Sequence, residues 1–314
     1  MAHTDLDSLF NRRLDFPDLS AAKRLHRLVG LDDVKTRLTK TLGVLVNHHG
    51  PQNWAKKHHP GAEVLLDYLG RRPPLVIFAG DVGTGKTELA EVIGDAVARQ
   101  EDIPITLFPL SLSTRGSGRV GEMTQLLTEA FEVVAQHATR LRGKASAKAG
   151  GAVIMLIDEG DALTQSREAT QMHHEDRAGV NAFIRGVDRL AEQHLPVVVI
   201  LCTNRLSSID PAVQRRAADI FRFARPNDAQ RRAVLETPLT EAGFSATEIS
   251  KIVKLTGATE APSVGFTFSD LTQRLLPTLV LDAYPDKSIT FHRAVELLGT
   301  ITATPQFIEK QEHS

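Results

Sequence analysis

The chain has 314 residues, long enough for about two domains with a buried core. Its formal net charge of -1 gives no overall basic field that would attract nucleic acid. Charged residues make up 24% of the chain, which is not the excess that is typical of disordered chains. The apolar runs are too short to span a membrane and the start lacks an apolar secretory segment, so we expect a cytoplasmic protein. The single cysteine, Cys202, excludes an internal disulfide and is expected to pack inside a strand.

The first 28 residues are polar and charged, and they predict an arm with one helix near residues 20–28. From Val29 onward, short runs rich in Val and Ile alternate with segments of helical periodicity. This alternation predicts a parallel sheet covered by helices, because strands buried on both faces read as continuous apolar runs. The expected strands lie at 75–79, 105–108, 153–157, 197–202 and 220–223.

The pattern changes after residue 223, where residues 224–228 predict a linker and no strong strand follows. Ser245 and Glu248 stand in capping-box spacing and Gly257 ends the same segment, which predicts a helix between them. Two more helices are expected, at 266–276 and 292–298. The predicted organisation is an arm at 1–28, an α/β domain at 29–225 and a mostly helical lid domain at 226–314.

The strand predicted at 75–79 runs directly into the sequence GDVGTGKT. Its Gly80, Gly85, Lys86 and Thr87 match the G-x-x-x-x-G-K-[ST] pattern of a phosphate-binding loop. Glycines let backbone N–H groups point at phosphate oxygens, the lysine brings a positive charge, and the threonine hydroxyl can ligate Mg²⁺. A helix-forming segment follows, and its N-terminal dipole favours an anion. The expected nucleotide contacts are Asp81, Val82, Gly83, Thr84, Gly85, Lys86 and Thr87.

Two carboxylates, Asp158 and Glu159, end the apolar strand predicted at 153–157. Carboxylates at the end of a buried strand are costly unless they have a partner, so they predict a functional site. Asp158 can hold the magnesium hydration shell, and Glu159 can orient or deprotonate an attacking water. Asn204 follows the strand at 197–202 and can position water or contact a γ-phosphate, although a lone Asn there also fits a simple turn.

The order of these motifs resembles that of AAA+ ATPases over about residues 29–300. The resemblance implies a P-loop α/β fold, with ATP and Mg²⁺ as cofactors, and it assigns Val29 and Gly30 to the segment beside the adenine. It also implies that Asp158, Glu159 and Asn204 are the magnesium, catalytic and first-sensor residues.

The segment IDPAVQRRAADIF is similar to the family stretch that carries an arginine finger at the subunit interface. Both Arg215 and Arg216 fit, and the spacing does not decide between them. Because such a finger acts on the nucleotide of a neighbouring subunit, the resemblance implies a ring-shaped homo-oligomer.

Three segments narrow the resemblance to the pachytene-checkpoint branch, whose members remodel HORMA-domain proteins. They are RAGVNAFIRGVDRL at 177–190, the short finger segment, and SDLTQRLLP at 269–277, where Arg274 matches the second sensor. The short arm is similar to bacterial relatives encoded with cyclic-oligonucleotide anti-phage systems. The resemblance implies an ATP-driven homohexamer that pulls on a HORMA-domain partner, as a negative regulator of anti-phage signalling.

The first pore loop of the family falls at 114–122, where Arg119 and Val120 replace the aromatic and small apolar pair. Grip on an extended chain is then expected to rest on aliphatic contact and charge. A second pore loop is expected at 165–177, and its His173 and His174 are not expected to bind a metal because their spacing does not suit zinc. The histidine pairs at 48–49 and 58–59 are interpreted as solvated loop residues.

Two other functions remain open from the sequence. The first is a nucleic-acid machine of the helicase-loader or clamp-loader kind, which the near-neutral charge disfavours. It would present Arg115, Arg119, Arg140, Arg142, Lys144 and Lys148 to phosphates. The second is a nucleotide-gated scaffold without productive hydrolysis, which Glu159, Asn204 and Arg274 disfavour.

Overall fold

The computed structural model describes residues 9–10, 12–111, 122–142, 149–162, 174–258 and 264–306. Arg119, Val120 and most of both predicted pore loops lie outside the described residues. The chain divides into two compact units. The first unit comprises Met1–Arg27, Asp33–Ala79 and Thr87–Arg222, and the second comprises Leu28–Asp32, Gly80–Lys86 and Phe223–Ser314.

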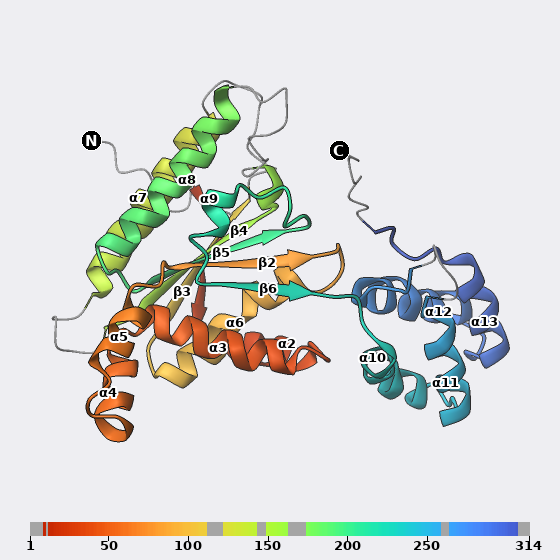
Figure 1. Ribbon diagram of the computed structural model, residues 1–314. Helices are drawn as coiled ribbons and strands as arrows, with labels where there is room; N and C mark the ends of the chain where they lie inside the picture. The colour runs from red at the N-terminus through yellow and green to blue at the C-terminus, as the bar shows by residue number, and fades with distance from the viewer. Residues whose placement is uncertain are drawn as a thin grey trace, which may run out of the picture. The chain divides into compact units, whose positions relative to one another are not determined.

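The first unit is built on one sheet, whose order in the described chain is β1-β3-β4-β5-β2-β6 (Figure 1). All five strands expected from the sequence are present: β2 (Leu75–Gly80), β3 (Ile105–Ser111), β4 (Ala152–Asp158), β5 (Val197–Thr203) and β6 (Asp219–Phe223). The pairs β3 with β4, β4 with β5 and β5 with β2 are parallel, as predicted. Cys202 is buried in β5, as expected.

The described sheet has six strands rather than the five predicted, because residues in the arm add a short edge strand. This strand, β1 (Leu14–Phe16), pairs antiparallel with β3 and sets Phe16 opposite Ile105. Phe16 is buried and its ring fills the space over Gly94, where an added Cβ would come within 2.5 Å of it. Three residues are too few to show an alternating pattern, so the sequence did not reveal this strand.

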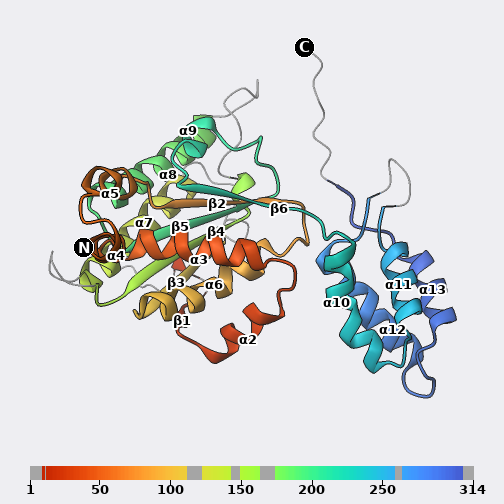
Figure 2. The same ribbon diagram turned by 60° about the horizontal axis from the view of Figure 1, so that its bottom comes forward.

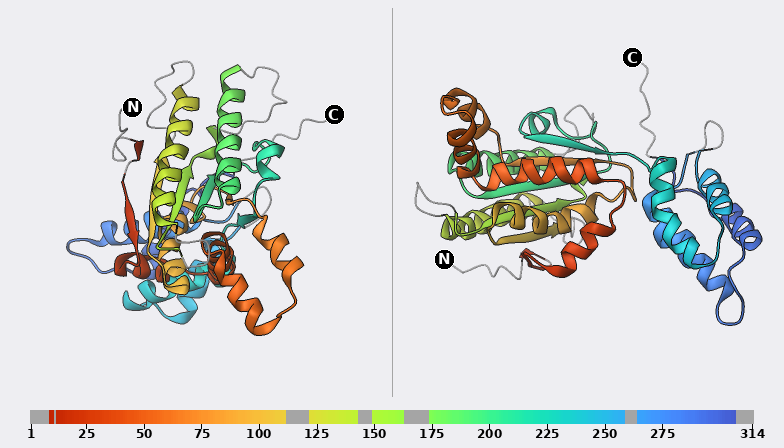
Figure 3. Two further views of the ribbon diagram at one scale, coloured as in Figure 1. Left: turned by 90° about the vertical axis from the view of Figure 1, so that its left-hand side faces the viewer. Right: turned by 90° about the horizontal axis from the view of Figure 1, so that it is seen from below.

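Helices cover both faces of the sheet. Figures 1 and 3 show α7 (Glu122–Leu141) and α8 (His174–Glu192) side by side on one face, with α3 (Asp32–Val46) and α6 (Lys86–Glu101) on the other. On the α7 and α8 face the core includes Phe131 and Phe183, whose ring centroids lie 5.8 Å apart. Coverage on both faces explains the continuous apolar runs of the central strands.

The remaining elements of this unit are short. The arm contains the predicted helix, α2 (Leu19–Arg27), after β1. The others are α4 (His49–His58), α5 (Glu63–Gly70), the 3₁₀ turn η1 (Gly160–Ala162) and α9 (Pro211–Gln214).

The second unit contains helices packed around a core of its own (Figure 2). They are α10 (Asp228–Glu241), α11 (Ala246–Leu255), the π turn η2 (Asp270–Leu275), α12 (Leu276–Ala283) and α13 (Phe291–Thr300). The predicted capping box of Ser245 and Glu248 starts α11. A second box, formed by Asn227 and Gln230, starts α10 inside the segment that the sequence had indicated as a linker.

Candidate nucleotide site

The predicted catalytic side chains follow neighbouring strands at one edge of the sheet. The parallel register pairs Ile157 of β4 with Leu201 of β5, and Ala79 of β2 with Thr203 of β5. The three strands therefore end together, and at this carboxyl edge Asp158 is the last residue of β4 and Asn204 follows β5. Ligands of open parallel sheets bind at this edge, so the fold places both residues where a nucleotide site is expected.

The backbone at Glu159 is strained. Glu159 has φ +55°, a left-handed conformation that side chains rarely adopt, and its N–H donates to Asp158 Oδ1 at 2.9 Å. The next residue, Gly160, packs so closely on β5 that an added Cβ would lie 2.4 Å from Leu201 Cδ1. The chain thus turns sharply after β4 and leaves the Glu159 side chain exposed. Strain of this kind is concentrated at functional sites.

Asp161 holds the end of β5 in place, a role that the sequence analysis missed. Its carboxylate accepts hydrogen bonds from the Thr203 hydroxyl, from the Asn204 N–H at 3.1 Å and from the Arg205 N–H at 3.2 Å. Asp161 therefore fixes the backbone of Asn204 across two strands. The sequence pattern that could have revealed this role is DEGD, in which Asp161 is a third carboxylate close to Asp158 and Glu159.

The loop Gly80–Lys86 has the conformation that a phosphate site requires. Gly83 and Gly85 have φ +76° and +91°, and an added Cβ on Gly83 would lie 2.6 Å from Thr267 Oγ1. Lys86 is 6% exposed, and its Nζ donates to the carbonyls of Gly80 and Asp81 at 2.8 Å each. Lys86 also begins the 16-residue helix α6, whose N-terminus favours an anion. These residues fit a polyphosphate, with Thr87 half-buried in the first turn of the helix.

Arg225 joins this loop to the rest of the second unit. Its Nε donates to Asp81 Oδ2 at 2.8 Å and its Nη1 donates to the carbonyl of Gly265 at 2.8 Å. Its Nη2 is buried and has no hydrogen-bond partner among the described residues. Nothing in the local pattern of the linker distinguishes this arginine, and the sequence analysis did not select it.

The segment assigned to the adenine is held by α10. Gln230 Nε2 donates to the carbonyl of Gly30 at 2.6 Å, and Gly30 has φ +75°. An added Cβ on Gly30 would lie 2.6 Å from Gln230 Cγ, so glycine satisfies both the backbone angle and the close approach. Val29, beside it, is half-buried.

The two candidate finger arginines differ in their contacts. Arg216 makes a bidentate pair with Asp188 of α8 at 2.7 and 3.0 Å, and this hydrogen bond raises the pKa of its guanidinium. Arg215 is exposed at the end of α9 and makes no ion pair within the described residues. Arg216 thus ties α9 to α8, whereas Arg215 remains available to another molecule.

Arg274 lies on the π turn η2. The N–H of Leu276 bonds to the carbonyl of Leu271, five residues back, and Pro277 has no N–H to continue a regular α-helix. Arg274 Nη1 donates to Asp270 Oδ1 and to the Thr302 carbonyl, at 2.8 Å each.

The carboxylate of Asp270 is fully buried beneath Arg274. Burial raises its pKa, but hydrogen bonds from the backbone of Thr267, from Thr304 and from Arg274 outweigh burial and lower the pKa to about 2. Asp270 is therefore ionised in the folded unit and anchors the turn that carries Arg274.

Comparison with known proteins identifies the family. Residues 76–225 match the model described as "ATPase family associated with various cellular activities (AAA)". CD-NTase-associated protein 6 from Escherichia coli (strain MS 115-1) is 60% identical over 306 residues, which are 98% of each chain. The chain belongs to the AAA ATPase family. This confirms the ATPase activity, the nucleotide binding and the P-loop α/β class expected from its motifs.

Solved structures give the same result for this ATPase. It is similar to a chain of the "Structure of E. coli MS115-1 HORMA:CdnC:Trip13 complex", with 58% identity, a TM-score of 0.91 and coverage of 98% of this chain and 100% of that chain. It is also similar to the "Structure of Rhizobiales Trip13", with 51% identity, a TM-score of 0.73 and coverage of 94% and 99%. The resemblance to the pachytene-checkpoint type and its short bacterial members is thereby confirmed. None of the described helices could cross a membrane.

Proposed function

We propose that this ATPase is a motor that pulls on a HORMA-domain protein and thereby disassembles or converts its complex. The observation that carries the proposal is the 58% identity, over nearly the whole chain, to a chain of a HORMA:CdnC:Trip13 complex. The relative named CD-NTase-associated protein 6 supports a role in regulating a CD-NTase-linked anti-phage system. The working form is a homohexameric ring in the cytoplasm.

In this proposal Lys86 and the loop Gly80–Lys86 hold the phosphates, while Thr87 and Asp158 hold Mg²⁺. Bound MgATP would supply the phosphoanhydride bond whose hydrolysis drives the motor. Glu159 accepts a proton from the attacking water, and its exposure at the carboxyl edge supports this role. Asn204 orients the water, with its backbone fixed by Asp161.

We assign the arginine finger to Arg215 rather than Arg216. Arg216 is bound on two of its nitrogens by Asp188, whereas Arg215 is exposed. A finger must reach the nucleotide of a neighbouring subunit, so an exposed guanidinium suits it better than one held within its own chain. Arg274 serves as the second sensor, and Arg119 and Val120 contact the partner chain.

Substitution of Glu159, the proposed general base, tests the motor proposal. Glu159→Gln is expected to bind ATP and to form rings, because its amide keeps the shape of the side chain, but it cannot accept the proton. Release of a fluorescently labelled HORMA-domain protein from its complex should then stop, while Glu241→Gln, an exposed change on α10, should release at the wild-type rate. Release by Glu159→Gln at the wild-type rate would show that the motor proposal is wrong.

A further inference from the structure

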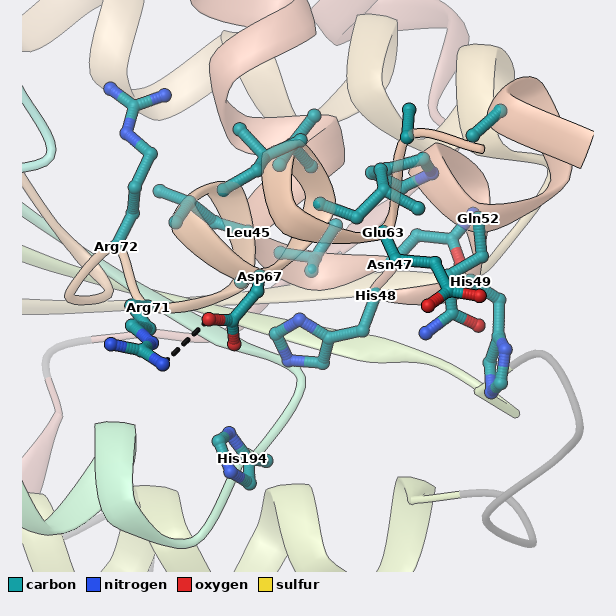
Figure 4. Close-up of a pocket in the computed structure, with 18 of the residues that line it drawn as sticks. Leu45, Asn47, His48, His49, Gln52, Glu63, Asp67, Arg71, Arg72 and His194 are labelled. Atoms are coloured by element: carbon teal, nitrogen blue, oxygen red, sulfur yellow. Dashed lines mark ion pairs between the residues drawn. The ribbon is translucent and has the colours of Figure 1, made fainter. Parts of the chain in front are cut away.

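A cavity lies in the first unit, at the edge of the sheet opposite to that of Asp158 and Glu159, and Figure 4 shows residues that line it. It has a volume of about 820 Å³ and is lined by the end of α3, by α4 and α5, and by the segments that precede three strands. Arg72 precedes β2, Ala149 precedes β4 and Pro196 precedes β5. A cavity of this size accommodates a nucleotide-sized molecule.

The lining of this cavity is rich in basic groups. Lys56, Arg71, Arg72 and Arg142 line it together with His48, His49, His59 and His194, against the carboxylates of Glu63 and Asp67. Asp67 is already paired with Arg71 at 2.6 Å, as the dashed line in Figure 4 shows. Arg142 and Lys56 make no ion pair among the described residues. The cavity therefore holds more positive than negative charge.

His48 lies in the wall of the cavity, close to His194. Figure 4 shows its ring facing the same opening as His194. Burial lowers the pKa of His48, and the nearby charges of His194, His49 and Arg142 lower it further, against a hydrogen bond with the backbone of Leu195. An anion between these groups would relieve their mutual repulsion.

We propose that this cavity is a second ligand site, for a small molecule that carries a phosphate group. The phosphate binds among Arg142, His48 and His194, and the rings of His48 and His194 lie 6.3 Å apart between their centroids. The apolar body of the molecule packs on Leu45 and Leu66, which line the same space. A phosphate suits the site better than a carboxylate because it offers more acceptor oxygens to the Arg142 guanidinium and to the N–H groups of the two histidine rings.

The test uses the full chain with Lys86→Ala, which weakens the phosphate loop so that binding there does not mask the second site. Pyrophosphate and adenosine 5′-monophosphate are the probes, titrated by calorimetry and by the NMR signal of the His48 ring up to about 10 mM. We expect heat and a shift of the His48 signal. Tighter binding of the monophosphate than of pyrophosphate supports contact with the apolar wall.

Two further variants locate the binding. Arg142→Ala and His194→Asn should each weaken binding about tenfold, the latter with an asparagine that tolerates the φ +48° of residue 194. Arg140→Ala, an exposed arginine two residues before Arg142, should leave binding unchanged. No response to either probe, or equal binding by the Arg142 and Arg140 variants, overturns the proposal. Hydrolysis and remodelling are not measured, so this outcome is independent of the proposed motor function.

Discussion

At the scale of the residue, Asp161 is expected to control catalysis without touching the nucleotide. Asp161→Ala removes the carboxylate that accepts from the Thr203 hydroxyl and from the N–H groups of Asn204 and Arg205, and Thr203 is only 1% exposed. The Thr203 hydroxyl can still donate to the Arg205 carbonyl, at 3.0 Å, but the Asn204 N–H loses its bond to the carboxylate, so the loop at Asn204 should relax. We expect kcat for ATP to fall about tenfold or more while the Kd for ATP changes little. Steady-state hydrolysis and titration with a fluorescent nucleotide measure the two quantities.

The matched control for this variant is Asp286→Ala, which removes an exposed carboxylate of the second unit and should leave kcat unchanged. Asp161→Asn should retain part of the activity, because its amide oxygen can still take the place of Oδ1, which accepts from the Thr203 hydroxyl and the Arg205 N–H. An unaltered kcat in Asp161→Ala would show that Asn204 does not depend on this carboxylate.

The ionised carboxylate of Asp270 is expected to make the free energy of unfolding depend on pH in acid. Its folded pKa of about 2 lies below the usual value of 3.8, so the folded state favours the ionised form. The stabilisation is present above about pH 4 and is lost as the pH falls through 2, and it amounts to about 2 kcal/mol at neutral pH. Urea unfolding followed by circular dichroism should show Asp270→Asn less stable than the wild type at pH 7. That difference should shrink between pH 4 and pH 2, and a difference that stays constant with pH would contradict the role of ionisation.

At the scale of the element, the sequence predicted what is encoded locally. Strands buried on both faces gave continuous apolar runs, and the motif residues Lys86, Thr87, Asp158 and Glu159 follow strands whose ends are visible in the sequence. The edge strand β1 was missed because it depends on pairing with β3. The start of α10 was missed because its N-cap residue, Asn227, lies inside the segment that was interpreted as a linker.

Contacts between distant residues set the part of the site that the sequence did not predict. Thr203 bonds to Asp161, 42 residues away, and Arg225 bonds to Asp81, 144 residues away. No periodicity or local spacing encodes such a pair, because tertiary packing alone brings the two residues together. The same holds for Arg216 and Asp188, whose pairing separates the two finger candidates only once α8 and α9 are in place.

The Arg225 and Asp81 pair should couple the phosphate loop to the segment at Gly265. The two side chains are 11% and 17% exposed, so removing one partner leaves a partly buried charge unpaired. Arg225→Ala should lower the free energy of unfolding and weaken ATP binding, because Asp81 and its loop lose an anchor. In a double-mutant cycle with Asp81→Ala, measured by urea unfolding, we expect a coupling of about 1–3 kcal/mol. Arg222→Ala, an exposed change on β6, is the control, and a coupling near zero would contradict the anchor.

At the scale of the whole molecule, the proposed ring implies that no subunit has a complete site by itself. The phosphate loop, Asp158 and Glu159 belong to one subunit, while the proposed finger, Arg215, is exposed and acts on the next. Two different inactive variants can then complement each other within one ring, which a monomeric enzyme cannot do.

This complementation can be measured by mixing subunits. Glu159→Gln keeps the finger but loses the base, and Arg215→Ala keeps the base but loses the finger, so each variant alone should hydrolyse ATP very slowly. After equal mixing and reassembly, about a quarter of the interfaces combine an intact base with an intact finger, and the rate should rise to about a quarter of the wild-type rate. A mixture no faster than its separate components would contradict the shared site. If Arg215→Ala is active alone and only Arg216→Ala complements Glu159→Gln, the finger is Arg216, and its pairing with Asp188 must then break when the ring forms.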